Sequence, residues 1–185
     1  MMTLRDRIKT FLRGFRDETR ATVAVEAVVI LPMLFWAYMA MFVFFDAYKQ
    51  VSINQKATYT IGDVLSRETT AINNAYLDGI DNMFKFLVRA DSTARLRVTV
   101  VRWDEKKGKF RRDWSKTRGD VTPLSAAQVT EMEDALPVMP DGERIIVVET
   151  WSRYTAPFNV GILSQDLHNR VFTRPRFAPK LVWGV

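Results

Sequence analysis

One long apolar segment dominates the pattern of hydrophobic and polar positions along the chain. Ala27–Phe45 is a run of nineteen residues without a charged side chain, and Glu26 and Asp46 bound it. A helix of this length extends roughly 28 Å, close to the thickness of the hydrocarbon core of a bilayer. The remainder of the chain is modest in size and rich in charges, so it offers no large core in which to bury such a helix. The pattern therefore predicts a single membrane span.

Helical periodicity continues beyond the apolar run. Asp46–Arg67 has a narrow stripe of apolar and small residues with polar residues on its other side, which predicts that the membrane helix extends into the head. Asn73–Val88 has a broad apolar face and is predicted to form a second helix. The stripe consists of Ala47, Val51, Asn54, Ala57, Thr58, Ile61 and Leu65.

The pattern then changes to a period of two. Ala94–Trp103 alternates between apolar and polar residues, and Phe110–Trp114 is expected to return as its partner strand. The polar turn between them places Gly108 where a positive φ is needed. Gly119–Leu124 is expected to be a loop, and Ser125–Leu136 a short helix with Ser125 as its N-cap.

The last third of the chain predicts further strands. Glu143–Tyr154 has the strongest strand pattern, and Pro157–Asn169 is expected to be a loop or a short helical stretch. Arg170–Thr173 and Arg176–Trp183 are expected to form a final strand or strand pair at a sheet edge, because two prolines interrupt them. The predicted fold class is α+β: a long N-terminal helix with one transmembrane span, then an exported head with an antiparallel sheet packed on helices.

The charges before the apolar run predict its orientation. Residues 1–20 contain six basic and three acidic side chains, so the N-terminus should remain in the cytoplasm and the C-terminal head should be periplasmic or extracellular. This basic leader is either an amphipathic helix on the inner leaflet or disordered. A cleaved secretory signal is the competing interpretation, but the apolar run is long for one and no A-x-A site follows it. The expected organisation is a leader at 1–20, the helix at 21–67 and the head at 68–185, in the inner membrane.

Composition excludes several kinds of chemistry. The 185 residues carry a net charge of +6 and include no cysteine, so disulfides and thiolate metal sites are excluded. The single histidine, His168, excludes a multi-histidine metal site within one chain. Asp78 and Asp81 lie three apart on the second helix, but no third ligand is near, so a solvated face is the preferred interpretation. We expect no metal and no cofactor.

Catalytic residues are equally sparse. No glycine-rich phosphate loop is present, and the serines that could pair with His168 lie outside any nucleophile motif. Glu149 lies within an apolar strand and is the best candidate for a buried carboxylate. Pairing with an arginine of a neighbouring strand, such as Arg97, is favoured over catalysis. We therefore do not expect an enzyme. The serines are Ser115, Ser152 and Ser164.

A run of basic residues covers the predicted hairpin. Arg95–Arg118 holds ten basic and three acidic residues, with three aromatic residues among them. A solvated face or a contact with a partner is the first interpretation, the membrane surface the second, and nucleic acid the last. The candidate contact patch comprises Lys106, Lys107, Arg111 and Arg112.

The junction before the span resembles a known family. Small residues, then Val25-Glu26-Ala27 and an apolar helix with Leu31-Pro32, are similar to the start of TadE/TadF-like minor pseudopilins of the tight-adherence (Flp-type) pilus, relatives of type IV pilins. The resemblance covers about a dozen residues. Ala21 stands where the family usually has glycine, and Ala27 where it usually has an aromatic residue.

The resemblance implies roles for particular residues. Ala21 would precede a cut by a prepilin peptidase, and Thr22 would become the new N-terminus. Glu26 would then pair with the α-amino group of an adjacent subunit and set the register between helices, with Pro32 allowing a kink. The expected partners are membrane lipid, other pilin or pseudopilin subunits and the peptidase. The alternatives are an anchored module that binds an extracellular polymer or DNA, and an anchored enzyme.

Overall fold

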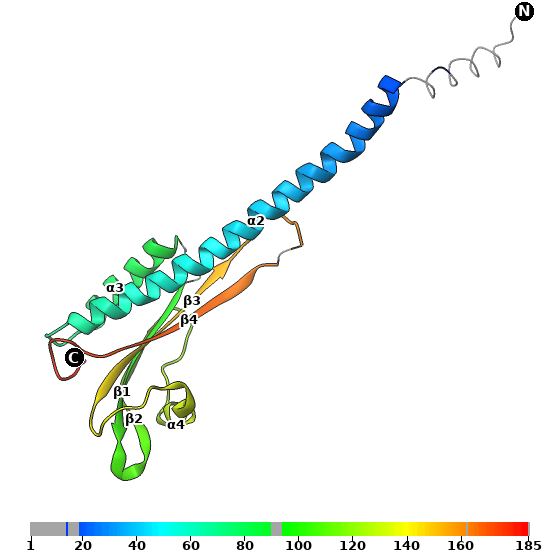
Figure 1. Cartoon of the computed structure of the whole chain (residues 1–185). Coiled ribbons are helices and arrows are strands. Elements are labelled where there is room, and N and C mark those ends of the chain that lie inside the picture. Colours follow the sequence, from blue (N-terminus) through cyan, green and yellow to red (C-terminus); the bar gives the residue numbers. More distant parts are fainter. Residues whose placement is uncertain (1–13, 15–18, 90–93, 162, 185) are drawn as a thin grey trace, which may run out of the picture. The chain divides into compact units, whose positions relative to one another are not determined.

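The computed structural model describes residues 14, 19–89, 94–161 and 163–184 of the chain, and their fold is α+β, as predicted (Figure 1). The basic leader predicted over residues 1–20 lies outside the described residues except at positions 14, 19 and 20. The elements, in chain order, are helices α2 (Thr19–Arg67) and α3 (Asn74–Val88), strand β1 (Arg95–Asp104), 3-10 helix η1 (Glu105–Lys107), strand β2 (Lys109–Arg118), helix α4 (Ala126–Glu131), 3-10 helix η2 (Glu133–Ala135), and strands β3 (Arg144–Tyr154) and β4 (Gln165–Thr173).

The chain divides into two compact units. One comprises residues 1–45 and 157–162, and the other comprises residues 46–156 and 163–185. Helix α2 contributes to both units. In the first unit the ring of Phe158 makes an edge contact with Phe42, with ring centroids 6.3 Å apart. The second unit contains the sheet and its covering helices.

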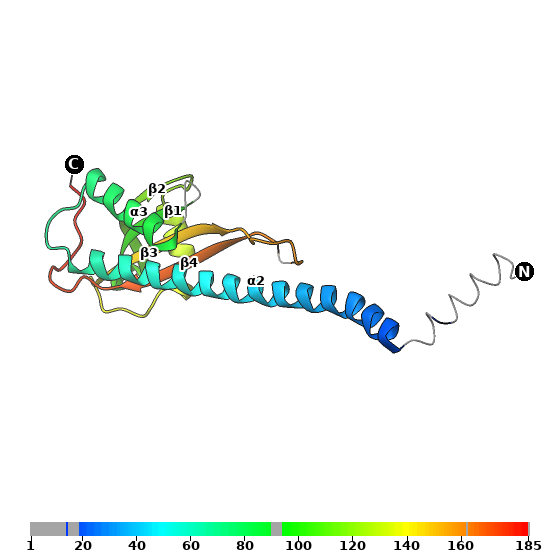
Figure 2. The ribbon, with the colours of Figure 1, turned by 90° about the horizontal axis from the view of Figure 1, so that it is seen from above.

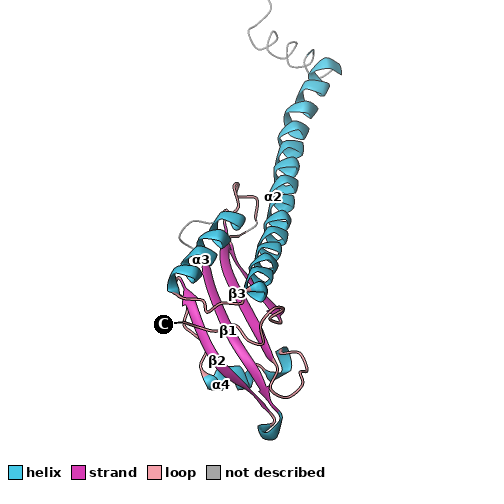
Figure 3. Ribbon diagram, turned by 90° about the vertical axis from the view of Figure 1, so that its left-hand side faces the viewer, coloured by secondary structure: helices cyan, strands magenta, loops and turns pink. Residues whose placement is uncertain are grey.

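The sheet of the second unit is antiparallel throughout, in the strand order β2-β1-β3-β4. Figure 3 shows the strands side by side with α3 crossing them. Strands β1 and β2 form the predicted hairpin, and Gly108 adopts the expected positive φ of 56° in its turn. Strand β2 extends to Arg118, beyond the predicted end at Trp114.

Helix α3 and the part of α2 after residue 45 cover one face of the sheet. Figure 2 shows α3 alongside this part of α2. Leu65 and Phe84 are fully buried there, together with residues of β1 and β3, because the apolar stripe of each helix faces the sheet. Val51 departs from the predicted stripe, since it is 45% exposed. The core on this face comprises Ala57, Ile61, Leu65, Ile72, Leu77, Ile80, Phe84, Val88, Ala94, Leu96, Val98, Val100, Ile146, Val148 and Leu181.

A second, smaller core lies on the opposite face of the sheet. Helix α4 and the segment after it bury Val129 and Leu136 against the sheet. Strand β3 therefore contributes to both cores, with Ile146 in the first and Ile145 in the second. This explains why its sequence is an almost continuous apolar run. The second core comprises Val101, Phe110, Leu124, Val129, Leu136, Met139, Ile145 and Val147.

Local side-chain hydrogen bonds define where the helices begin. The Asn73 side chain accepts a hydrogen bond from the backbone N–H of Tyr76 and caps α3. The predicted cap Ser125 forms a capping box with Gln128, in which each side chain bonds the other residue's backbone. The predicted helix from Ser125 is shorter than expected, because α4 ends at Glu131 and η2 follows.

A polar seam joins α2 to β3 within the second unit. The hydroxyl groups of Thr58 and Thr150 lie 2.6 Å apart in the buried interface. Next to them the Ser152 hydroxyl donates to the Asn54 side-chain oxygen. At the end of the strand the Tyr154 hydroxyl donates to Asp46 at 3.0 Å, and burial together with this bond raises the pKa of Tyr154.

Two predicted elements differ from the structure. Residues 165–169 were expected in a loop or short helix, but they begin β4 as an edge strand paired with β3. Residues 176–183 were expected to be a strand, and this prediction is wrong. That segment lies along the sheet without joining it, and Trp183 makes only an isolated parallel bridge to Ile72. Pro175 and Pro179 lack the N–H groups that a strand would need there.

Candidate functional site

The apolar part of α2 exposes large side chains. Val28, Met33 and Phe35 are 71%, 72% and 66% exposed. Exposed apolar patches of this extent normally mark a surface that is covered by a membrane or a partner. Among the described residues, α2 is the one helix long and apolar enough to cross a membrane.

The residues implied in processing and register all lie in α2. The helix includes Ala21 and Thr22, and it passes through Pro32 without ending. Glu26 is exposed and forms no ion pair with another described residue.

The best-formed polar site of the second unit surrounds Glu149, which is fully buried. Its Oε2 atom accepts a hydrogen bond from Nε of Arg97 at 2.7 Å and forms an ion pair with Nη2 of the same residue at 2.6 Å. Its Oε1 atom accepts a hydrogen bond from Nε of Arg170 and forms an ion pair with Nη2 of that residue, both at 2.9 Å. The predicted pairing with Arg97 is therefore confirmed, and the carboxylate is saturated by two guanidinium groups.

An aromatic stack lies beside this carboxylate. The His168 ring stacks on Trp151 with centroids 4.7 Å apart, and the Arg97 guanidinium lies over the same indole. His168 Nε2 is 3.6 Å from Glu149. Partial burial lowers the pKa of His168; the Glu149 carboxylate opposes this effect, whereas Arg170 reinforces it.

The three serines considered as nucleophiles either form hydrogen bonds with other residues or lie in a loop. Ser152 bonds Asn54, and Ser115 shares a hydrogen bond with Thr99 on β1. Ser164 lies in the loop before β4. None of the three forms a hydrogen bond with His168 in the described part of the chain.

The two aspartates of α3 form ion pairs with different basic side chains. Asp78 pairs with Arg118 of β2, whereas Asp81 pairs with Lys85 one turn along the helix. Across the described ranges, no three His, Asp or Glu side chains gather as a metal ion would need.

The predicted basic patch is divided by the sheet. Lys106 and Lys107 are exposed in η1 at the hairpin turn. Arg111 is opposite Arg102, but a β-bulge at Asp113 places Arg112 opposite Val101 of the second core. As successive residues of β2, Arg111 and Arg112 leave opposite faces of the sheet, and the Arg112 guanidinium donates to the Leu124 carbonyl.

Sequence reasoning missed two groups of basic residues. His168 joins Glu149 because residues 165–169 extend β4, and that mostly polar segment has no apolar alternation to signal a strand. Arg170 begins the predicted final strand, but its register opposite Glu149 was not predicted. Arg144 and Lys180 lie with Arg102 and Arg111 in a groove of about 470 Å³. The one signal in the sequence for Arg144 is its position at the start of the strand pattern of β3.

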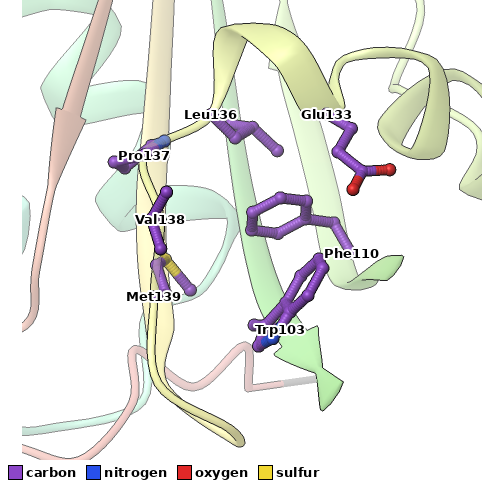
Figure 4. Close-up of a pocket in the computed structure, with 7 residues that line it drawn as sticks. All are labelled: Trp103, Phe110, Glu133, Leu136, Pro137, Val138 and Met139. Carbon is purple, nitrogen blue, oxygen red and sulfur yellow. The ribbon is translucent and has the colours of Figure 1, made fainter. Parts of the chain in front are cut away.

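A small apolar pocket of about 180 Å³ lies on the second core. Figure 4 shows the Phe110 ring between Leu136 and Trp103, with Met139 at the lower edge. Val138, which also lines the pocket, is 97% exposed. The pocket contains one ionisable side chain, Glu133, so it offers binding of apolar groups rather than acid–base chemistry.

Together these features define the chain as an α+β protein with a long apolar N-terminal helix and an antiparallel sheet covered on both faces. Comparison with protein-family models, curated proteins and solved structures found no match to the chain.

Proposed function

We propose that this chain is a single-pass membrane protein that acts as a pseudopilin-like subunit in the assembly of a tight-adherence (Flp-type) pilus. The exposed apolar surface of α2, with the carboxylate of Glu26 at its N-terminal border, is the observation that carries the proposal. The N-terminal flank faces the cytoplasm, α2 crosses the inner membrane, and the sheet-containing unit lies outside. The protein has no catalytic role of its own.

Glu26 sets the axial register between the helices of neighbouring subunits. An exposed carboxylate beside nineteen uncharged residues is unfavourable in hydrocarbon unless a cation meets it. A parallel bundle of such helices presents the α-amino group of a neighbouring subunit, freed by a prepilin peptidase between Ala21 and Thr22. The pair selects one axial stagger between subunits, as buried polar pairs do in coiled coils.

Mass spectrometry of the purified full chain tests the processing step. With a prepilin peptidase co-expressed, we expect a chain that begins at Thr22. Ala21→Gly should increase the processed fraction, because it introduces the glycine that the family usually has at this position. An intact N-terminus in both forms, with the peptidase shown active on another substrate, would exclude the cut.

Glu26→Ala tests the register. We expect normal membrane insertion but fewer assembled pili, counted by electron microscopy of a strain that lacks the native copy. Glu105→Ala, which removes an exposed carboxylate from the hairpin turn, is the matched control and should leave pili unchanged. Normal piliation with Glu26→Ala would contradict the role of this carboxylate.

The orientation is tested by labelling single cysteines, since the chain has none of its own. A membrane-impermeant maleimide should label Lys106→Cys in intact spheroplasts. It should label Thr3→Cys only after lysis. The reverse pattern would contradict the proposed topology.

A further inference from the structure

The groove in the second unit is built around a row of arginines. Arg111 of β2 is directly opposite Arg102 of β1, and Arg102 is directly opposite Arg144 of β3. Neighbouring strands are about 4.8 Å apart, so three guanidinium stems leave adjacent strands side by side. Like charges directly opposite each other destabilise a sheet. Such a row therefore calls for negative charge in front of it.

The chain supplies only part of that charge. Asp113, the residue of the β-bulge, accepts a hydrogen bond from Arg144 Nε at 2.7 Å. Asp104 accepts one from Arg111 at 3.3 Å. Arg102, at the centre of the row, is left with an ion-pair distance of 4.0 Å to Asp113, and its Nε finds no hydrogen-bond acceptor in the described part of the chain.

Lys180 adds another positive charge to the groove and forms no ion pair with any described residue. Four basic side chains, Arg102, Arg111, Arg144 and Lys180, thus meet two carboxylates, and a net charge of two positive remains. Arg112 also borders the groove, but its side chain leaves the other face of the sheet, where its guanidinium donates to the Leu124 carbonyl, so its charge is not counted.

The opposite wall of the groove is held in place before any ligand arrives. Trp183 packs on Trp114 with ring centroids 5.5 Å apart, and Trp114 Nε1 donates to the Leu181 carbonyl at 3.0 Å. The backbone of Ile72 bonds this segment on both sides, accepting from Gly184 and donating to Val182. A fixed wall reduces the entropy lost on binding.

We propose that this groove binds a phosphate monoester, with Arg102 as the central ligand-binding side chain. A phosphate monoester carries about 1.5 to 2 negative charges near neutral pH, which matches the uncompensated charge of the groove. Its three terminal oxygens can accept from several guanidinium forks at once, whereas a single carboxylate offers two. The volume suits a small molecule or a lipid headgroup rather than a polymer.

Isothermal titration calorimetry on the full chain in nonionic detergent micelles tests the proposal. The probes are glycerol 3-phosphate, inorganic phosphate and, in mixed micelles, phosphatidic acid; succinate is the dianion without phosphate. We expect the phosphate probes to bind more tightly than succinate. Binding of the soluble probes identifies a free phosphate compound as sufficient, and binding of phosphatidic acid alone identifies a lipid headgroup. Either result supports a phosphate site.

Arg102→Gln should weaken binding of the phosphate probe about tenfold or more, because the central fork is lost. Lys106→Gln removes the same charge from the exposed hairpin turn and should change affinity less than about twofold. Near-UV circular dichroism checks that the tryptophans keep their packing. If Arg102→Gln does not fold, Arg111→Gln at the groove margin takes its place.

Three results would overturn the proposal. They are binding of no probe, succinate binding as tightly as glycerol 3-phosphate, and equal losses of affinity in Arg102→Gln and Lys106→Gln. The groove proposal does not rest on pilus assembly, so either can fail without the other.

Discussion

Replacing the buried carboxylate of Glu149 should destabilise the sheet-containing unit more than any surface change. Glu149→Gln preserves the side chain's shape but gives it one oxygen and one NH2 group. In the structure, one carboxylate oxygen accepts from Arg97 and the other from Arg170. The amide can satisfy one arginine only, and it presents a donor to the donor groups of the other.

The exposure of the two arginines determines which one loses its partner and at what energetic cost. The Arg97 side chain is 12% exposed and the Arg170 side chain 31% exposed, so the amide oxygen should turn to Arg97 while Arg170 moves toward water. Breaking a fully buried pair costs about 3–5 kcal/mol, and partial hydration of Arg170 lowers this. We expect Glu149→Gln to cost about 2–4 kcal/mol.

Urea unfolding of the full chain in detergent micelles, followed by near-UV circular dichroism, measures this change. With an m value of about 2 kcal/mol per molar urea, the midpoint should fall by roughly 1–2 M. Arg170→Gln should lower the free energy of unfolding less than Glu149→Gln does, because Arg97 still neutralises the Glu149 carboxylate. Glu131→Gln, at an exposed position at the end of α4, is the matched control and should change stability by less than about 0.5 kcal/mol.

A cost below about 0.5 kcal/mol for Glu149→Gln would show that the carboxylate is hydrated and that the burial argument is wrong. An Arg170→Gln variant as unstable as Glu149→Gln would show that both arginines are equally essential, contrary to their exposures.

Three further predictions follow from local geometry. Partial burial lowers the pKa of His168, so its imidazole, the only one in the chain, should titrate below about 6.5 by NMR. Because the unfolded chain then binds the proton more tightly than the folded chain, the free energy of unfolding should fall as the pH drops through that range. A midpoint above 6.5 would mean that the nearby carboxylate outweighs burial. Ser125→Ala removes the cap of α4 and should cost about 1 kcal/mol in urea unfolding, and Ser125→Asn should restore most of it. Gly119→Ala should lower the melting temperature more than Gly108→Ala: both glycines have a positive φ, but only at Gly119 would a Cβ lie 2.9 Å from Arg95. Equal losses would show that the neighbouring side chain moves aside without cost.

Much of the fold can be read from periodicity, because burial imposes it. The apolar run of α2 and the stripe after it, the two-sided apolar run of β3 and the glycine of the β1–β2 turn all identify their elements correctly. The alternation of β3 also places Glu149 on the face of Arg97, which the register confirms. In each case the constraint is local, because one face of a segment is buried or one residue must adopt a positive φ.

Residues 165–169 show where periodicity fails. Strand β4 lies at the edge of the sheet, and the apolar cores do not include its first half. Leu167 is the one apolar residue among those five positions, so the segment resembles a loop. Periodicity also misleads at residues 176–183, where it predicts a strand that the structure does not contain. The apolar residues of this segment resemble a strand, but they serve as a wall packed on Trp114 and the helices. Both outcomes depend on which neighbours are present, and a single segment does not encode its neighbours.

The sequence by itself determined the long apolar helix, the α+β class and the hairpin, because each follows from the hydrophobic period of its own segment. Apart from the pair of Arg97 and Glu149, which the sequence predicted, the tertiary structure decided which charges meet. Pairing with β1 and β3 aligns Arg111, Arg102 and Arg144, and the bulge at Asp113 adds one residue to β2, so that Arg112 rather than Asp113 is opposite Val101. Strand register is set by contacts between strands, and shifting it by one residue exchanges the two faces of the sheet.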